Sequence, residues 1–329
     1  NHHRVTLTLR PDNALNSRGD AAETAHLTAI RNALTEQDCQ HIIAQSLALQ
    51  ARQEAPVEDG ILPGVNLSDV PVTMQIPQPA SVVVSPIHLT RYQAGTNGLV
   101  YLQLIIDLPE LTHHELSLLP IFSSFITEVG CGSADYLQMQ HRQAAVCGGI
   151  SAYPSMRGGI DDVHQVQGYL VLSIKALASK QSQASALLYD TWLSPRFNEL
   201  QRLRELMNQM RTRRERSLTS SGHSLAMAAA SAGLSPLARY QHDVTGLGGV
   251  LAMKQLDRAL DDQPALEHFS RQLANLHQKL LSQPAQFLLV AEEERLAAAT
   301  NTLQAQWTAH STTATQAFTL AHTANTVSE

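Results

Sequence analysis

The chain has 329 residues, of which 43% are apolar and 16% are charged, as in globular proteins and unlike disordered or fibrous ones. No apolar run approaches the roughly 20 residues that a membrane-spanning helix requires, and residues 1–10 lack the apolar stretch of a signal peptide. The net charge of −6 argues against general nucleic-acid binding, which needs a positive surface.

The first 80 residues predict a strand, two helices and a connector. A strand over 5–9 begins abruptly, as it would in a fragment of a longer protein. Thr35 and Asp38 have the spacing of a capping box, which predicts that a second helix begins there. Apolar residues at helical spacing therefore predict a helical hairpin over 20–51: Leu27, Ile30, Leu34, Cys39, Ile42, Ile43 and Leu47. Prolines and glycines over 55–79 predict an extended connector.

A strand-rich stretch follows the connector. Apolar and alternating patterns predict strands over 81–85, 87–93 and 99–107. Asn97-Gly98 is a strong turn signal, so we expect the last two of these strands to form a hairpin.

The remainder of the chain predicts mainly helices. Thr112 is expected to cap a helix that Pro120 restarts or kinks and that stops at Gly130. Further helices are predicted over 135–146, 196–216, 224–232, 247–260, 265–281 and 292–307. Strands are predicted over 150–153, 169–174 and 286–290, and a tail over 311–329. This order predicts an α+β fold, with a mainly antiparallel sheet and helices packed on it.

The histidines do not form a recognisable zinc motif. A zinc peptidase needs His-Glu-x-x-His or its inverse, because that spacing puts two imidazoles on one helix face, and neither pattern occurs. His113-His114-Glu115 is the local cluster, but adjacent helical residues point in different directions. We weighed a metal role for this cluster and prefer ordinary first-turn surface residues.

Two further motifs have a functional and an ordinary interpretation. Ser221 and His223 place a hydroxyl near an imidazole, but no Gly-x-Ser-x-Gly elbow is present, and a turn and helix cap are the simpler interpretation. The stretch 246–249 (Gly-Leu-Gly-Gly) lacks the spacing and the Lys of a phosphate-binding loop, which favours a turn entering a helix.

Charged and thiol groups also favour structural roles. The run 211–216 (Arg-Thr-Arg-Arg-Glu-Arg) ends a predicted helix, where cations complement the helix dipole, and no aromatic residues accompany it as in nucleic-acid binding. Cys39, Cys131 and Cys147 are odd in number and far apart, so they predict no disulfide framework and favour a reducing compartment. Cys131 and Cys147 lack an evident activating histidine, so inert thiols are the expectation.

Three segments carry a resemblance to a known family. They are 119–152 (LPIFSSFITEVGCGSADYLQMQHRQAAVCGGISA), 194–209 (SPRFNELQRLRELMNQ) and 221–236 (SGHSLAMAAASAGLSP). Together they resemble the peptidase-associated region of the presequence-protease branch of the pitrilysin/insulinase zinc peptidases. Residues 66–71 (NLSDVP) resemble the connector between the halves of those enzymes, and the resemblance covers roughly 5–310.

The resemblance implies a four-unit enzyme of which this chain holds the linker and the third unit. In that family, zinc is bound in the first unit by His-x-x-Glu-His and a distant Glu, and the fourth unit supplies an Arg and a Tyr. The Cys131-Gly132-Ser133 segment matches one that follows the zinc helix, which puts the ligand positions near Ser123 and Thr127. Hydroxyls are poor zinc ligands, so we expect no catalytic, cofactor-binding or metal-ligating residue in this chain.

The resemblance also implies a function for the whole. We expect a non-catalytic, chamber-forming segment of a zinc metallopeptidase that degrades unfolded oligopeptides, with zinc held elsewhere in the full-length enzyme. Its partners would be the remaining units and unfolded peptides, not nucleic acid or membrane, in bacterial cytoplasm or an organelle matrix. The expected divisions are 1–70 (end strand and hairpin linker), 71–310 (α+β domain) and 311–329 (tail). The alternatives are a zinc-less scaffold or binding protein of the same superfamily, and a hydrolase that uses Ser221 and His223.

Overall fold

A computed structural model of the chain describes residues 12, 14–55, 64–73, 76–84, 87–307, 318 and 320. The chain divides into two compact units, Asn1–Met74 and Gln75–Glu329. The strand predicted over 5–9 lies outside the described residues, as does the predicted tail apart from Phe318 and Leu320.

The first unit holds the two predicted helices. They are α1 (Leu15–Ala33) and α2 (Glu36–Glu54), followed by the short 3₁₀ helix η1 (Leu67–Asp69). The capping box at the start of α2 is confirmed, because the Thr35 hydroxyl accepts from the Asp38 amide and the Asp38 carboxylate accepts from the Thr35 amide at 2.9 Å. No residue of α2 is buried, and its apolar side chains remain more than half exposed at Ile43 and Leu47.

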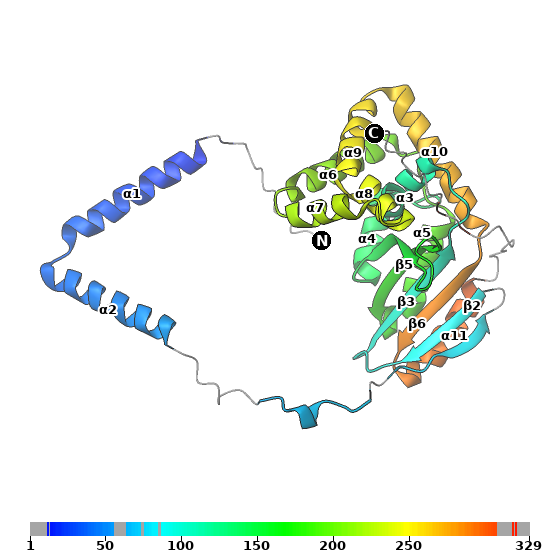
Figure 1. Ribbon diagram of the computed structural model, residues 1–329, viewed down its shortest axis with the longest axis horizontal. Helices are drawn as coiled ribbons and strands as arrows, with labels where there is room; N and C mark the ends of the chain where they lie inside the picture. The colour runs from blue at the N-terminus through cyan, green and yellow to red at the C-terminus, as the bar shows by residue number, and fades with distance from the viewer. Residues whose placement is uncertain are drawn as a thin grey trace, which may run out of the picture. The chain divides into compact units, whose positions relative to one another are not determined.

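The second unit is built on a six-stranded sheet with the order β1-β2-β6-β3-β5-β4 (Figure 1). The strands are β1 (Ala80–Val84), β2 (Ile87–Gln93), β3 (Leu99–Asp107), β4 (Ile150–Gly158), β5 (Val166–Leu177) and β6 (Ala285–Ala291). In the described sheet β2 and β6 run parallel, and every other neighbouring pair is antiparallel. The strand positions predicted for this unit are confirmed, and β4 and β5 extend beyond the predicted ranges.

The predicted hairpin between the second and third strands is wrong. Asn97 and Gly98 do adopt the positive φ angles of a tight turn, 52° and 75°, so the local signal is real. However, β6 lies between β2 and β3 and pairs with both of them. A dipeptide fixes the turn, but it cannot exclude a strand that arrives from far downstream in the chain.

Helices pack on the sheet and complete the predicted α+β class. In the second unit these are α3 (His113–Ile126), α4 (Tyr136–Val146), α5 (Gln181–Leu193), α6 (Leu200–Ser217), α7 (Gly222–Ser231), α8 (Pro236–Thr245), α9 (Leu247–Ala259), α10 (Gln263–Leu281) and α11 (Glu293–Gln306), with the 3₁₀ helix η2 (Ala178–Lys180) before α5. α3 contacts β4, α5 contacts β5, and α11 contacts β1, β2 and β6, so the helical layer spans the sheet (Figure 1). None of the described helices is long and apolar enough to cross a membrane.

Two helices differ from their predicted form. The helix predicted from Arg196 begins only at Leu200, because the Arg196 amide donates to the Gly130 carbonyl at 2.8 Å and holds the preceding segment in a bridge. α3 runs without interruption through Pro120, although proline cannot donate to the carbonyl four residues earlier. That carbonyl, on Leu116, accepts instead from the Tyr240 hydroxyl at a long 3.5 Å.

The sheet has one buried face and one partly exposed face. In β3 the buried positions alternate with more exposed ones, as a sheet covered on one side requires. The buried face continues across the central strands through Val100, Leu102, Leu104, Ile106, Leu170, Leu172, Ile174, Phe287 and Leu289. On the opposite face Tyr101 is 39% exposed and Tyr153 is 43% exposed. We call this second surface the open sheet face.

Candidate functional site

The positions that correspond to zinc ligands in the resembled family lie on α3 and are buried. Ser123 is 2% exposed, and its hydroxyl donates to the Pro120 carbonyl at 3.0 Å. Thr127 is 8% exposed, and its hydroxyl donates to the Ser124 carbonyl at 3.4 Å. Both hydroxyls therefore satisfy their own helix, and their chemistry does not fit a zinc site. Among the described residues no group of three or more His, Cys, Asp or Glu could hold a metal ion.

The His113-His114-Glu115 cluster forms the first turn of α3. Glu115 closes a capping box with Thr112, and its carboxylate also lies 2.5 Å from the Lys279 ammonium. The hydrogen bonds and this cation hold the pKa of Glu115 below its usual value, although its burial acts in the opposite direction. His113 and His114 are exposed, and a His114 ring nitrogen lies 2.7 Å from the Gln272 amide nitrogen. The cluster is the predicted first-turn surface.

Ser221 and His223 do not form a nucleophile and base in this structure. Ser221 is the residue before α7, but its side chain makes no capping hydrogen bond. No hydrogen bond joins Ser221 to His223 among the residues that the structure describes. Ser221 instead borders a cavity of about 300 Å³ that Arg214, Ser217 and Ser224 also line.

The glycine-rich stretch joins two helices with almost no loop. Gly246 ends α8 and begins α9, and its amide already donates to the Gln241 and His242 carbonyls at 3.1 Å. A Cβ atom on Gly249 would lie 2.0 Å from the Val244 carbonyl oxygen. Glycine is therefore required for close packing of α8 and α9, and the amide of Gly246 is not available to a phosphate.

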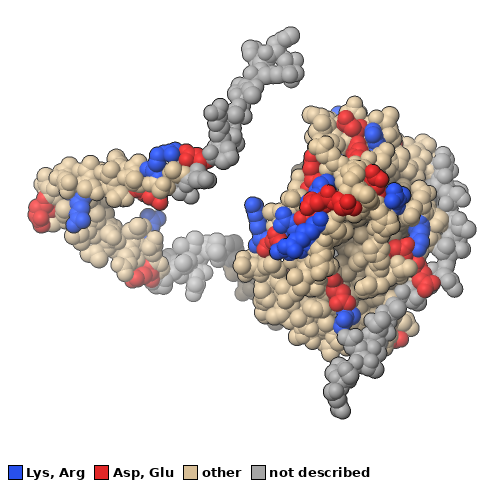
Figure 2. All heavy atoms as spheres, turned by 90° about the horizontal axis from the view of Figure 1, so that it is seen from above, with Lys and Arg blue, Asp and Glu red and all other residues tan. Residues whose placement is uncertain are grey.

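The basic run at the end of α6 is divided between ion pairs and a cavity. The Arg211 Nε atom lies 2.6 Å from an Asp257 carboxylate oxygen, in an ion pair without hydrogen-bond geometry, and Arg211 also pairs with Glu215. Asp257 also pairs with Arg204 at 2.5 Å. On the face of the larger unit that Figure 2 shows, basic and acidic side chains likewise lie next to each other.

The cysteines of the larger unit are poor nucleophiles. Cys131 is 5% exposed, and burial raises the pKa of its thiol to about 12. Burial also raises the pKa of Cys147. A thiolate is the reactive form of cysteine, so both thiols are inert near neutral pH, as their sequence context predicts.

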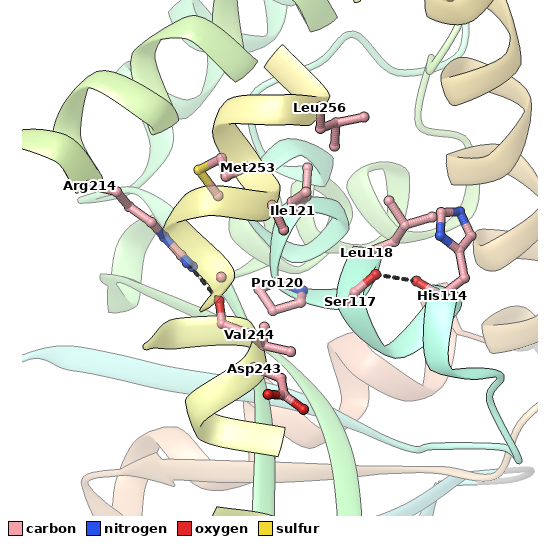
Figure 3. A pocket seen from close by; sticks show the side chains of 12 residues that line it. His114, Ser117, Leu118, Pro120, Ile121, Arg214, Asp243, Val244, Met253 and Leu256 are labelled. Atoms are coloured by element: carbon pink, nitrogen blue, oxygen red, sulfur yellow. Dashed lines mark hydrogen bonds between the residues drawn. The ribbon is translucent and has the colours of Figure 1, made fainter. Parts of the chain in front are cut away.

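A cavity of about 210 Å³ lies between α3, α6, α8 and α9 (Figure 3). Its walls are mainly apolar, and three ionisable side chains reach it. It is lined by His114, Ser117, Leu118, Pro120, Ile121, Arg214, Asp243, Val244, Gly249, Ala252, Met253 and Leu256.

Arg214 is the unusual group in this cavity. It comes from α6, and its Nη1 atom donates to the Val244 carbonyl at 2.7 Å (Figure 3). Burial lowers the pKa of Arg214 from its ordinary value. Within the described part of the chain no carboxylate forms an ion pair with this guanidinium, whereas Asp243 is paired with Arg239 at 2.9 Å. The sequence analysis placed Arg214 in a solvated helix end and did not find this cavity.

Comparisons with known proteins identify the class to which this scaffold belongs. The chain is 28% identical over 263 residues to "Presequence protease, mitochondrial" of Danio rerio, covering 79% of this chain and 26% of that protein. It is 25% identical over 288 residues to "Presequence protease 1, chloroplastic/mitochondrial" of Arabidopsis thaliana, with 86% and 26% covered. The chain thus spans about a quarter of the length of these relatives.

One solved structure shares the fold. It is the "Crystal structure of a conserved protein from Enterococcus faecalis V583", with a TM-score of 0.50 and 13% sequence identity over 73% of this chain and 54% of that chain. At that identity the likeness concerns the fold alone.

The family is shown by a sequence model. The model describes the region associated with the peptidases of metallopeptidase family 16, subfamily C, and it matches residues 9–256. The chain belongs to this peptidase-associated family, and the predicted resemblance to the presequence-protease branch is confirmed.

Proposed function

We propose that this chain is a non-catalytic, chamber-forming segment of a zinc metalloendopeptidase that degrades unfolded oligopeptides. The named presequence proteases are about four times longer than the aligned segment, which leaves room for units that hold zinc and perform the cleavage. The remaining units of the same polypeptide and unfolded peptides would be its partners. The mitochondrial and chloroplastic names of the relatives support an organelle matrix for a eukaryotic source, and bacterial cytoplasm remains the alternative.

The side chains on α3 support the absence of a catalytic centre in this segment. Ser123 and Thr127 stand near the positions where the resembled family has ligands, and their hydroxyls are bonded within the helix. A catalytic zinc site requires nitrogen, sulfur or carboxylate donors. We therefore propose that the chain has no catalytic, cofactor-binding or metal-ligating residue, and that zinc belongs to another unit.

The open sheet face is the observation that carries the proposed chamber role. The strand register places Ile105 opposite Val171 and Tyr153 opposite Val171, so an apolar row crosses three strands on this face. A second row aligns Tyr101 with Val290. Partly exposed aromatic and apolar side chains of this kind suit transient contacts with the varied side chains of an unfolded peptide, and such surfaces on soluble proteins commonly mark interaction sites.

The domain division accompanies this proposal. We assign 1–70 to a linker between halves of the enzyme, 71–310 to the α+β domain and 311–329 to a tail. The short helix η1 lies at the end of the proposed linker, and Leu67 within it is 89% exposed.

Metal analysis and peptide cleavage test the division of labour. The 329-residue chain is expected to lose zinc on dialysis and to leave a fluorogenic peptide uncut, whereas a longer polypeptide with an upstream His-x-x-Glu-His should retain zinc and cleave it. Stoichiometric zinc and chelator-sensitive cleavage by the chain alone would overturn the proposal.

Substitutions on the open sheet face test the chamber role in the longer polypeptide. Tyr101→Ser and Tyr153→Ser should lower kcat/KM for a long unfolded peptide without a matching loss of thermal stability, because both side chains are well exposed. Ile160→Ser is the matched control, since Ile160 is fully exposed outside the strands. Equal activity of all three variants and the unsubstituted enzyme would remove the support for this face.

A further inference from the structure

The cavity between α3, α6, α8 and α9 holds a cation without a protein counter-ion among the described residues. Arg214 donates one hydrogen bond to the Val244 carbonyl, and within that part of the chain it has no carboxylate partner. Partial burial of an unpaired guanidinium is unfavourable, and a guanidinium presents five donors in a planar fork. Its neighbours on α6 differ in this respect, since Arg204 and Arg211 both have acidic partners.

We propose that this cavity binds a small carboxylate that carries an apolar side chain, such as an apolar amino acid, either free or at the C-terminus of a peptide. The Arg214 guanidinium would hold the carboxylate, and Ile121, Met253 and Leu256 would contact the side chain. This site is separate from the α3 positions discussed above and does not depend on the proposed chamber role.

The distribution of charge and apolar surface determines the class of ligand. Arginine binds planar carboxylates in a bidentate geometry, which gives both strength and orientation. Asp243, the acidic side chain among the described residues that line the cavity, is held by Arg239, so its charge is partly compensated. Apolar walls around a few polar groups are typical of small-molecule sites, whereas a phosphate would be expected to need more donors than this cavity offers.

The volume limits the size of the ligand. About 210 Å³ is less than the roughly 300 Å³ at which sites for drug-sized ligands begin. The cavity therefore suits one residue rather than several. His114 lies across the cavity from Arg214 (Figure 3), where it could contact the amide end of a peptide-borne residue.

Binding should be measured on the 329-residue chain with probes that differ by one group. The probes are N-acetyl-leucine, its primary amide, free leucine, acetate and the peptide Gly-Gly-Leu. Methyl-labelled methionine resonances report binding, because Met253 lines the cavity and can be assigned from a Met253→Leu variant. The peptide and free leucine distinguish the two sources of the carboxylate.

We expect N-acetyl-leucine to shift the Met253 resonance and to bind at least about tenfold more tightly than its amide, because the amide loses the charge-assisted hydrogen bonds. Acetate should bind more weakly than N-acetyl-leucine, since it lacks the apolar side chain. Equal binding of the acid and the amide would overturn the proposal, as would the absence of binding by every carboxylate probe at millimolar concentration.

Substitutions locate the site. Arg214→Gln should weaken N-acetyl-leucine binding by about tenfold or more, and Arg213→Gln, at an exposed neighbour on the same helix, should leave it unchanged. Arg214→Gln also removes the hydrogen bond to Val244, so a second variant is needed that leaves this bond intact.

Cavity-filling variants provide that second test. Ala252→Phe places a ring in the cavity from an exposed position on α9 and should abolish binding. Arg214 also borders the second cavity, so Ser224→Phe, at an exposed residue lining only that one, is the matched control and should bind normally. Loss of binding in Ser224→Phe with normal binding in Ala252→Phe would place the ligand in the second cavity and contradict the proposal.

Discussion

His277 lies at the centre of the aromatic core of the larger unit. It is 4% exposed, and its Nε2 atom lies 2.7 Å from the Trp192 carbonyl oxygen, which requires that nitrogen to carry the proton. The Trp192 ring contacts it edge-on with centroids 5.3 Å apart, and Phe122 stacks on it at 6.2 Å. Burial lowers the pKa of His277 from the ordinary 6.5, although the hydrogen bond to Trp192 opposes this shift.

Stability should therefore decrease as the pH falls below about 6.5, because the unfolded chain then binds a proton that folded His277 resists. The contribution is complete above that pH and is lost toward the lowered pKa, with a slope of at most about 1.4 kcal/mol per pH unit. Urea unfolding at about pH 7.5 and about pH 5.5 should show a smaller decrease for His277→Gln than for the unsubstituted chain. Exposed His223→Gln should retain the full decrease. Identical pH dependence in both variants would refute the assignment to His277.

Residue chemistry in this chain was predictable where it depended on neighbours in sequence. The hydroxyls of Ser123 and Thr127 could be judged poor ligands from their residue type alone. Arg214 could not be singled out, because the sequence shows a run of arginines and not which of them meets an acid. Pairing depends on α9, which brings Asp257 to Arg204 and Arg211 but supplies no carboxylate to Arg214.

At the level of elements, the junction of α8 and α9 depends on a single glycine. Gly249→Ala should destabilise the chain by roughly 1–3 kcal/mol or more, because its Cβ would lie 2.0 Å from the Val244 oxygen and 2.4 Å from its carbonyl carbon. Gly248→Ala is a matched control one residue away, where the nearest atom is at 3.8 Å. That variant should be neutral or more stable by roughly 0.5–1 kcal/mol, since alanine favours the helix. Comparable urea midpoints for the two variants would contradict the packing argument.

The ion pairs between α6 and α9 should differ in strength according to burial. Asp257 is 5% exposed and contacts both Arg204 and Arg211, so Asp257→Asn should cost roughly 3 kcal/mol by leaving buried positive charge uncompensated. The Asp261 side chain is 72% exposed, and Asp261→Asn should cost less than about 1 kcal/mol although it also pairs with Arg204. Thermal or urea unfolding of both variants provides the measurement, and a larger loss for Asp261→Asn would reverse the assignment.

Elements with strong local signals were predicted, and those that depend on distant contacts were not. The capping boxes at Thr35, Thr112 and Asp135 each mark an observed helix start. α5 and α8 were not predicted, because α5 mixes serine, alanine and glutamine with its apolar residues and α8 is short. The order of strands was beyond reach for a different reason, since the position of β6 depends on the completed sheet and not on any turn.

At the level of the whole molecule, the two units should unfold separately. Both tryptophans of the chain, Trp192 and Trp307, are buried in the larger unit, whereas α2 has no buried residue. Helices of 19 residues that lack a packed face are marginal in water. Far-UV circular dichroism should therefore decrease at lower urea than the tryptophan emission changes. Coincident transitions for the two signals would show that the chain unfolds as one cooperative unit.

The position of β6 between β2 and β3 has a consequence for biosynthesis. As the chain leaves the ribosome, β1 and β2 emerge as one ribbon and β3, β4 and β5 as another, and each presents an unpaired edge until Ala285–Ala291 is available. Two incomplete ribbons with bare edges invite pairing with other nascent chains, and closure over such a sequence separation is slow. A nonsense mutation anywhere before Ala291 would leave the ribbons without the strand that joins them, so even a late truncation should yield aggregated material.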